Sequence, residues 1–209
     1  MNLGKLFMLQ NELDAHIEQQ HPRKEGESRH DKKVLALLVE LGELANEARF
    51  FKFWSRDQEP RLEVICHACK GIGEFHHQVF SGPYHTDDKT EICLYCSGTG
   101  IQKRPLLEEY VDCLHFILSI GLELNFTDID VWKVKEATTT NQFIECFGTI
   151  YKMHFQNRVT GEVPREMYEH LFACFIGLGE MLGFTWEEIE KAYLAKNQKN
   201  HDRQDSGVY

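Results

Sequence analysis

The chain has 209 residues, of which 42% are hydrophobic, and a formal net charge of −10. This length allows one core, or one core with a small module, and excludes a large multidomain protein. The negative charge disfavours a nucleic-acid surface, because phosphate contacts need clustered Lys and Arg. We find no N-terminal signal pattern and no apolar run of the roughly 18 residues that span a bilayer, and therefore expect a cytoplasmic protein without membrane contact.

Helical periodicity covers most of the chain. Apolar residues recur at helical spacing over residues 3–19, 32–54, 106–124 and 141–155. Pro164 suits the first turn of a further helix through Met181, and Thr185 opens the capping box "TWEE" of the last helix. A glycine- and cysteine-rich insert at residues 57–104 interrupts this pattern. We therefore predict an all-α helical bundle over residues 1–209 that contains a small insert.

The second helix contains the stretch "LLVELGELANE", from Leu37 to Glu47. At about 100° per residue, apolar side chains cover most of its circumference, and Glu40, Glu43 and Glu47 form one narrow strip. A solvated helix face normally mixes Lys with Glu over a broad surface. The narrow acidic strip therefore indicates carboxylates that point into a site, although a solvated face is the simpler alternative.

The third helix repeats this design, with a strip that consists of Glu108, Glu109, Asp112, His115 and Ser119. Two facing acidic strips would repel, because carboxylates that share a space of low dielectric constant cannot all stay ionised. Divalent cations remove that conflict, and oxygen ligands suit Mg²⁺ or Mn²⁺. The i, i+3 spacing lets each helix offer one pair of carboxylates to a metal cluster: Glu40 with Glu43, and Glu109 with Asp112.

These motifs resemble a known superfamily. "ELGE" and "EYVD" are similar to the ExxE…ExxD signature of the all-α NTP pyrophosphatases, which include MazG-like enzymes and the dimeric dUTPases. Three further segments resemble the dimeric dUTPases in particular: "LFMLQNELDAHI", "FKFWS" and "AKNQKNHDRQDSGVY". Together with "EEYVDCLHFILSIGLELNF", the resemblance spans nearly the whole chain apart from the cysteine insert.

The resemblance implies a homodimer that hydrolyses dUTP to dUMP and diphosphate. It also implies that Mg²⁺ is held by the carboxylates of Glu40, Glu43, Glu109 and Asp112. Such chemistry needs the polyphosphate charge neutralised and a water molecule oriented in line, which two or more Mg²⁺ ions achieve. One carboxylate then acts as general base, and the spacing leaves three candidates: Glu40, Glu43 and Glu47.

The resemblance also implies where the base binds. In the family a Gln and an Asn on the first helix contact the uracil; Gln10 matches the first, and Asp14 stands in place of the second. Trp54 is a candidate for packing on the base or sugar, and His115 for closing the pocket near the deoxyribose. Ordinary core packing is the alternative for both.

The C-terminal segment "KNQKNHDRQD" carries cations and amides. If the last helix continues here, Lys196, Asn200 and Arg203 share a face with Asn197 at its edge, and their donors suit phosphate oxygens. A solvated, frayed terminus is the alternative.

The insert contains two copies of CxxCxGxG, "CHACKGIG" and "CLYCSGTG", which are similar to the cysteine-rich repeats of J-domain co-chaperones. Two CxxC turns supply the four thiolates of a closed tetrahedral zinc site: Cys66, Cys69, Cys93 and Cys96. We expect a structural Zn²⁺ in a reducing compartment rather than a disulfide framework.

Two other functions remain compatible with the sequence. One is a MazG-like pyrophosphatase for another or a modified nucleotide. The other is a zinc-containing, non-catalytic protein-binding module, against which stand the absence of a J-domain-like "HPD" tripeptide and the presence of only two repeats.

Overall fold

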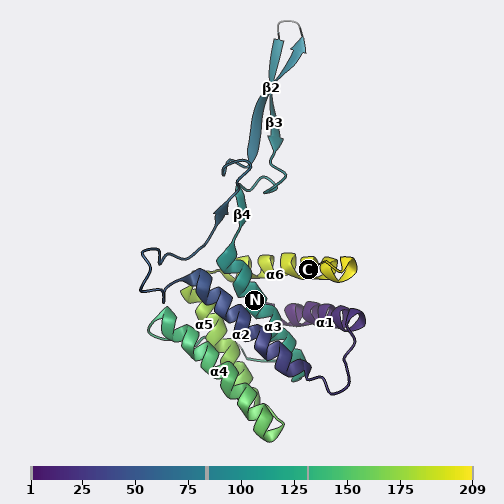
Figure 1. The fold of residues 1–209 in the computed structure, drawn as a ribbon, viewed down its shortest axis with the longest axis vertical. Helices are drawn as coiled ribbons and strands as arrows, with labels where there is room; N and C mark the ends of the chain where they lie inside the picture. The colour runs from purple at the N-terminus through teal and green to yellow at the C-terminus, as the bar shows by residue number, and fades with distance from the viewer. Residues whose placement is uncertain (1, 83–84, 131, 209) are drawn as a thin grey trace. The chain divides into compact units, whose positions relative to one another are not determined.

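The computed structural model describes residues 2–82, 85–130 and 132–208 (Figure 1). The chain divides into two compact units: Met1–Glu59 with Leu107–Tyr209, and Pro60–Leu106. The first unit is helical, and the strands of the described residues all lie in the second. No helix in these described ranges is both long and apolar enough to cross a membrane. The predicted all-α fold with a small insert is therefore confirmed.

Six helices form the described fold: α1 (Leu3–Gln20), α2 (Arg29–Ala48), α3 (Pro105–Glu123), α4 (Thr139–Thr160), α5 (Arg165–Met181) and α6 (Trp186–Ser206). α1 packs beside α6, and α4 packs on both α5 and α2 (Figure 1). The first and last helices of the chain are thus neighbours. This pairing brings the N-terminal amide and acid side chains close to the C-terminal cations.

Local capping explains where several helices begin. Thr138 accepts a hydrogen bond from the amide of Asn141, and Ser28 does the same for Asp31. The predicted capping box of the last helix is present, because Thr185 and Glu188 each bond the other's backbone N–H group. α6 continues to Ser206, so the proposed phosphate donors lie on a helix.

The second helix ends earlier than the apolar pattern predicts. It stops at Ala48, because Arg49 adopts a left-handed conformation with φ of 64° and its amide closes on Ala45. The Arg49 guanidinium is buried, donates to the Asp57 carbonyl at 2.6 Å and pairs with the Asp57 carboxylate at 3.1 Å. The "FKFWS" segment with Trp54 therefore follows the helix and does not extend it.

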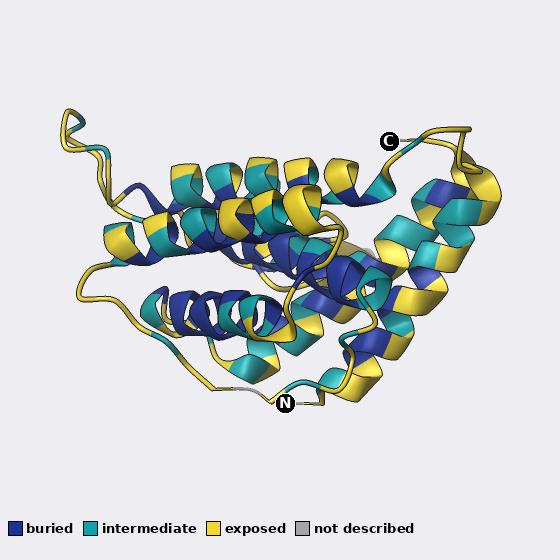
Figure 2. Ribbon diagram, turned by 90° about the horizontal axis from the view of Figure 1, so that it is seen from below, coloured by how far each residue is buried: buried dark blue, intermediate teal, exposed yellow. Residues whose placement is uncertain are grey.

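Two buried tyrosines fix α3 against α5. Tyr110 donates to the carbonyl of Phe175 at 3.1 Å, and Tyr168 donates to the carbonyl of Ile117 at 3.0 Å. Each hydroxyl lies over a glycine of the facing helix, where a Cβ atom would approach within 2.4 Å of Tyr110 at Gly179 and 2.1 Å of Tyr168 at Gly121. The ribbon in Figure 2, coloured by burial, shows that the buried residues lie on the inward sides of the helices.

The insert consists of two antiparallel strand pairs. β1 (Val64–Ile65) pairs with β4 (Ile101–Lys103), and β2 (Glu74–Gly82) pairs with β3 (His85–Ile92) in a long exposed hairpin. Its only buried cluster consists, among the described residues, of the cysteines Cys66, Cys69, Cys93 and Cys96 with Ala68 packed beside them. A unit with so little apolar core needs another source of stability, such as a metal.

Candidate active site

A cleft of about 1180 Å³ lies among α1, α2, α3 and α6. Eight of the residues predicted from the sequence line it: Gln10, Asp14, Glu40, Asp112, His115, Lys196, Asn200 and Arg203. They come from four helices and are separated by up to 193 positions in the chain, from Gln10 to Arg203. The helical fold therefore gathers acids, amides and cations at one concave surface, as a binding site for a polar anion requires.

Three carboxylates of the two acidic strips converge. Glu40 and Glu43 of α2 and Glu109 of α3 each offer an oxygen, and the three oxygens lie within 4.8 Å of one another. The fourth predicted ligand, Asp112, lies one turn further along α3. Its Oδ2 atom contacts the Nζ atom of Lys196 at 2.5 Å, so a cation from α6 neutralises it.

The carboxylates of this cluster raise one another's pKa values. Burial, together with the negative charges of Asp112, Glu43 and Glu40, raises the pKa of Glu109 to about 7. Burial and the carboxylates of Asp112 and Glu43 also raise the pKa of Glu40. Burial raises the pKa of Asp112 as well, although Lys196 opposes that shift. A divalent cation among these oxygens would relieve the repulsion, and all of the oxygens are hard ligands of the kind that Mg²⁺ accepts.

Hydrogen bonds hold Gln10 in a fixed orientation in the cleft. Its side chain is 3% exposed, and its Oε1 atom accepts hydrogen bonds from Tyr193 and from Nδ1 of His115, both at 2.8 Å. Its Nε2 atom donates to Asp14 at 2.7 Å. Asp14 in turn accepts from Ser119 at 2.5 Å and from Lys33 at 3.3 Å. The network orients the amide and leaves one N–H of Gln10 available for a ligand acceptor.

His115 is neutral in this network. Burial, assisted by the charge of Lys196, lowers its pKa to about 3. The hydrogen bond to Gln10 assigns the proton to Nδ1, so Nε2 carries a lone pair. Within the described part of the chain this buried Nε2 atom has no hydrogen-bond partner. The ring therefore presents an acceptor that a ligand hydroxyl or N–H could satisfy.

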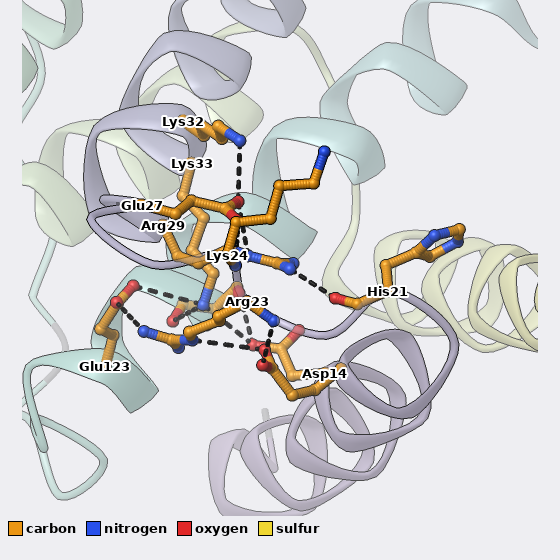
Figure 3. Close-up of polar contacts among 11 residues, drawn as sticks. Asp14, His21, Arg23, Lys24, Glu27, Arg29, Lys32, Lys33 and Glu123 are labelled. Carbon is orange, nitrogen blue, oxygen red and sulfur yellow. Dashed lines mark hydrogen bonds and ion pairs between the residues drawn. The ribbon is translucent and has the colours of Figure 1, made fainter.

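Ion pairs surround the cleft where α1 leads into α2 (Figure 3). Lys33 contacts Asp14 and Glu123, both at 3.3 Å, and Lys32 contacts Glu27 at 2.7 Å. Arg29 also pairs with Glu27, at 2.9 Å. Hydrogen bonds from the Lys24 amide and the Lys32 side chain lower the pKa of Glu27 to about 2. Lys32 and Lys33, in the first turns of α2, are thus engaged by acids, and Lys196 of α6 contacts Asp112.

The structure places five predicted residues outside the cleft lining: Glu43, Glu47, Trp54, Glu109 and Asn197. Glu43 and Glu109 share the carboxylate cluster with Glu40, which lines the cleft. Glu47 lies two turns beyond Glu40 on α2. Trp54 is 66% exposed and packs edge-on against Phe51 and Phe53. Asn197 is buried and its Nδ2 atom lies 3.5 Å from the Leu9 carbonyl, a contact that joins α6 to α1.

Two residues of the site, Lys33 and Phe116, were not among the predicted site residues, and a third, Ser119, was predicted only as a member of the acidic strip of α3. Lys33 and Ser119 hold Asp14, and Phe116 lines the cleft beside His115. The position of Ser119 on the acidic strip of α3 was the sequence feature that pointed to it. Phe116 could not be distinguished from a core residue by its helical position, and Lys33 could not be distinguished from a surface cation.

The insert contains a second constellation. Sγ atoms of Cys66 and Cys93 lie 3.8 Å apart, and those of Cys69 and Cys96 lie 3.7 Å apart. Four sulfur atoms at the usual zinc–sulfur distance of about 2.3 Å would be about 3.8 Å from one another in a tetrahedron. The amides of Gly73 and Gly100 donate to the second thiol of each CxxC pair.

The two repeats have the same backbone geometry. Gly73 and Gly100 have φ of 87° and 74°, and a Cβ atom at either would lie within 2.4 Å of a carbonyl oxygen. Burial opposes ionisation in this cluster and raises the pKa of the Cys93 thiol to about 11, whereas hydrogen bonds from the Gly73 and Gly71 amides and neighbouring thiols lower the pKa of Cys69 to about 6. A thiolate is the form that binds a metal. The cluster therefore has the ligands and spacing of a zinc site.

The family model described as dUTPase matches the chain over residues 2–71 and 97–208. The chain belongs to the dUTPase family. The match covers the whole helical unit that holds the carboxylates and the cleft, and its gap at residues 72–96 falls within the insert. No curated protein matches the chain. The enzyme is a dUTP diphosphatase, which hydrolyses dUTP to dUMP and diphosphate. The family match therefore supports an enzyme that hydrolyses dUTP and argues against a non-catalytic binding module.

Proposed function

We propose that this dUTPase is a Mg²⁺-dependent enzyme, also active with Mn²⁺, whose metal ligands are Glu40, Glu43, Glu109 and Asp112. The observation that carries the proposal is the convergence of three carboxylate oxygens from α2 and α3 within 4.8 Å, with the pKa of Glu109 raised to about 7. When bound, the metal neutralises the triphosphate and makes water a better nucleophile.

One of the α2 glutamates acts as general base. Glu40 is the candidate that position favours, because it lines the cleft and burial raises its pKa, which increases its affinity for a proton. Glu43 shares the carboxylate cluster, and Glu47 lies one turn further on the same helix. The base takes a proton from water as the water oxygen attacks phosphorus and the bond to the diphosphate group breaks.

Gln10 and His115 recognise the nucleoside in this proposal. The free N–H of Gln10 donates to a uracil carbonyl oxygen, and the Nε2 lone pair of His115 accepts from the deoxyribose hydroxyl. Asp14 contributes through the orientation of Gln10. A cytosine amino group at the position of the carbonyl would oppose the Gln10 donor, which disfavours that base. Trp54 stays a prediction for base or sugar packing, since it lies outside the cleft lining.

The triphosphate binds the cations of α6. Lys196, Asn200 and Arg203 line the cleft on successive turns, and Lys196 already contacts Asp112. Charge-assisted donors of this kind match phosphate oxygens. Asn197 supports the arrangement by joining α6 to α1.

Single substitutions of Glu40, Glu43 and Glu47 to Gln test these roles. We expect Glu40→Gln and Glu43→Gln both to weaken metal binding, and Glu40→Gln to lose turnover even at saturating Mg²⁺ while dUTP still binds. Circular dichroism controls for the helical fold. A Glu40→Gln enzyme with normal kcat would exclude Glu40 as the base.

The four cysteines of the insert bind a structural Zn²⁺, which supplies the stability that its small core lacks. The Sγ separations of 3.7 Å and 3.8 Å support this assignment. No disulfide joins the seven cysteines, all of which lie within the described residues, and metal-binding thiolates need reducing conditions; both points support our placement of the enzyme in the cytoplasm.

We further propose that the enzyme is a homodimer that uses an apolar stripe on α4. The stripe consists of Ile144, Tyr151, Phe155 and Val159, which are 54% to 64% exposed in the single chain. Gly148 lies within the same stripe, and a Cβ atom there would meet nothing within 4 Å, so another helix could approach closely. Light scattering tests this proposal: we expect twice the chain mass for the wild type and a monomer for Tyr151→Glu.

A further inference from the structure

A group of potential metal ligands lies on α4 and α5, outside the cleft and the insert. Glu145 belongs to α4, and His170 and Cys174 lie one turn apart on α5. One ligand atom of each lies within 4.8 Å of the other two. Neither the carboxylate chemistry of the cleft nor the cysteine repeats use these residues.

Both polar contacts within this group involve the Nε2 atom of His170. Nε2 of His170 lies 3.1 Å from Oε1 of Glu145 and 3.4 Å from Sγ of Cys174. If Nε2 carries a proton, it can donate to Glu145, but then it cannot accept from the Cys174 thiol. If it carries a lone pair, it can accept from the thiol, but that lone pair faces a carboxylate oxygen. A cation bound by all three atoms would satisfy them together.

We propose that Glu145, His170 and Cys174 form a second transition-metal site, which Zn²⁺ fits. At the usual ligand distances of a tetrahedral zinc site, nitrogen and sulfur are about 3.6 Å apart and nitrogen and oxygen about 3.4 Å apart. The observed separations of 3.4 Å and 3.1 Å are within a few tenths of an ångström of these values. A thiolate and an imidazole select Zn²⁺ over Mg²⁺, whose preferred ligands are oxygens.

The surrounding residues hold the ligands in place. Thr149 donates to Glu145 at 3.3 Å, as residues around metal ligands commonly do. Gln142 is fully buried and donates to the backbone carbonyl of Cys174 at 2.7 Å, which fixes α4 against α5 at this level. Three protein ligands leave a fourth position for water, and the side chain of His170 is 40% exposed, so solvent reaches the site. Bound zinc joins the two helices.

Metal content of the full-length enzyme tests the site. The protein is equilibrated with Zn²⁺ in excess Mg²⁺, which keeps zinc from the carboxylate cluster, and is then desalted and analysed for zinc. We expect Glu145→Gln and His170→Ala to retain one zinc per chain fewer than the wild type. Cys146→Ala, which removes a buried thiol of α4 outside the group, should retain the wild-type content. Equal zinc content in wild type and His170→Ala would overturn the proposal.

Two further measurements distinguish a bound metal from a structural contact. Cobalt substitution should produce thiolate-to-metal charge-transfer absorption that is reduced in Glu145→Gln, and Thr149→Val should weaken zinc binding about ten- to hundredfold. dUTP hydrolysis should be unchanged in Glu145→Gln, because none of these residues lines the cleft. Identical cobalt spectra for wild type and Glu145→Gln would also overturn the site.

Discussion

The raised pKa of Glu109 predicts that metal binding in the active site depends on pH near neutrality. A metal ligand must be ionised, so a proton on Glu109 competes with Mg²⁺ or Mn²⁺. With a pKa of about 7, this carboxyl is ionised in about one molecule in eleven at pH 6 and about ten in eleven at pH 8. The dissociation constant for Mn²⁺ should therefore fall about tenfold between pH 6 and pH 8.

Electron paramagnetic resonance of free Mn²⁺ measures this constant directly. Glu109→Gln should weaken binding and flatten the pH dependence, because the titrating ligand is gone. Glu108→Gln, a change at the neighbouring exposed position, should retain the tenfold effect. Equal dissociation constants at pH 6 and pH 8 for the wild type would refute the assignment of Glu109 as a metal ligand with a raised pKa.

The same shift has a defined effect on stability. The folded-state pKa of Glu109 lies above its ordinary value of 4.5. Its contribution to the free energy of unfolding is therefore fully present below pH 4.5 and is lost as the pH rises through about 7. The melting temperature of metal-free protein should therefore decline across this window more steeply for the wild type than for Glu109→Gln. Saturating Mn²⁺ should reduce the decline.

Three further predictions follow from the site and the insert. Lys196→Met should lower kcat/KM for dUTP about ten- to hundredfold in steady-state assays, as expected for one lost charge-assisted hydrogen bond. An unchanged kcat/KM would show that the phosphate donors lie elsewhere. Gln10→Leu should raise KM and lower the free energy of unfolding, measured with denaturant, by about 1–3 kcal/mol, because Tyr193 and His115 lose the acceptor that they share. Wild-type values of both quantities would contradict the network. Replacing Cys66 and Cys69 by Ser should remove one zinc per chain from the metal content, and an unaltered content would rule out the four-cysteine site.

The sequence predicted those features that depend on local spacing. The i, i+3 pairs Glu40/Glu43 and Glu109/Asp112 identified the two acidic helices, and the CxxCxGxG repeats identified the sulfur cluster. Both patterns place their ligands within one or two turns, so periodicity alone brings the members of each pair together. The capping box at Thr185 is local in the same way.

Features that depend on tertiary contacts were not predictable in this way. Periodicity extends the second helix to Trp54, but the buried contact between Arg49 and Asp57 ends it at Ala48. The pairing of Asp112 with Lys196 joins residues 84 positions apart. Likewise, the hydrogen bond from His115 to Gln10 spans 105 positions. Such contacts become visible only when the packing of α1, α3 and α6 is known.

The α4–α5 ligand group could not be predicted from the sequence, because its members are far apart in the chain. Glu145 is 25 positions from His170 and 29 from Cys174, and neither α4 nor α5 carries a metal-binding motif. A glutamate, a histidine and a cysteine on apolar helices are individually ordinary.

Diphosphate release from the deoxynucleoside triphosphates, with Mg²⁺ and with EDTA, tests the central claim most directly. The account predicts rapid release from dUTP with Mg²⁺, much slower release from dCTP, and none from dUTP in EDTA. Full activity in EDTA would contradict the carboxylate–metal mechanism. Equal rates with dUTP and dCTP would contradict base recognition by Gln10.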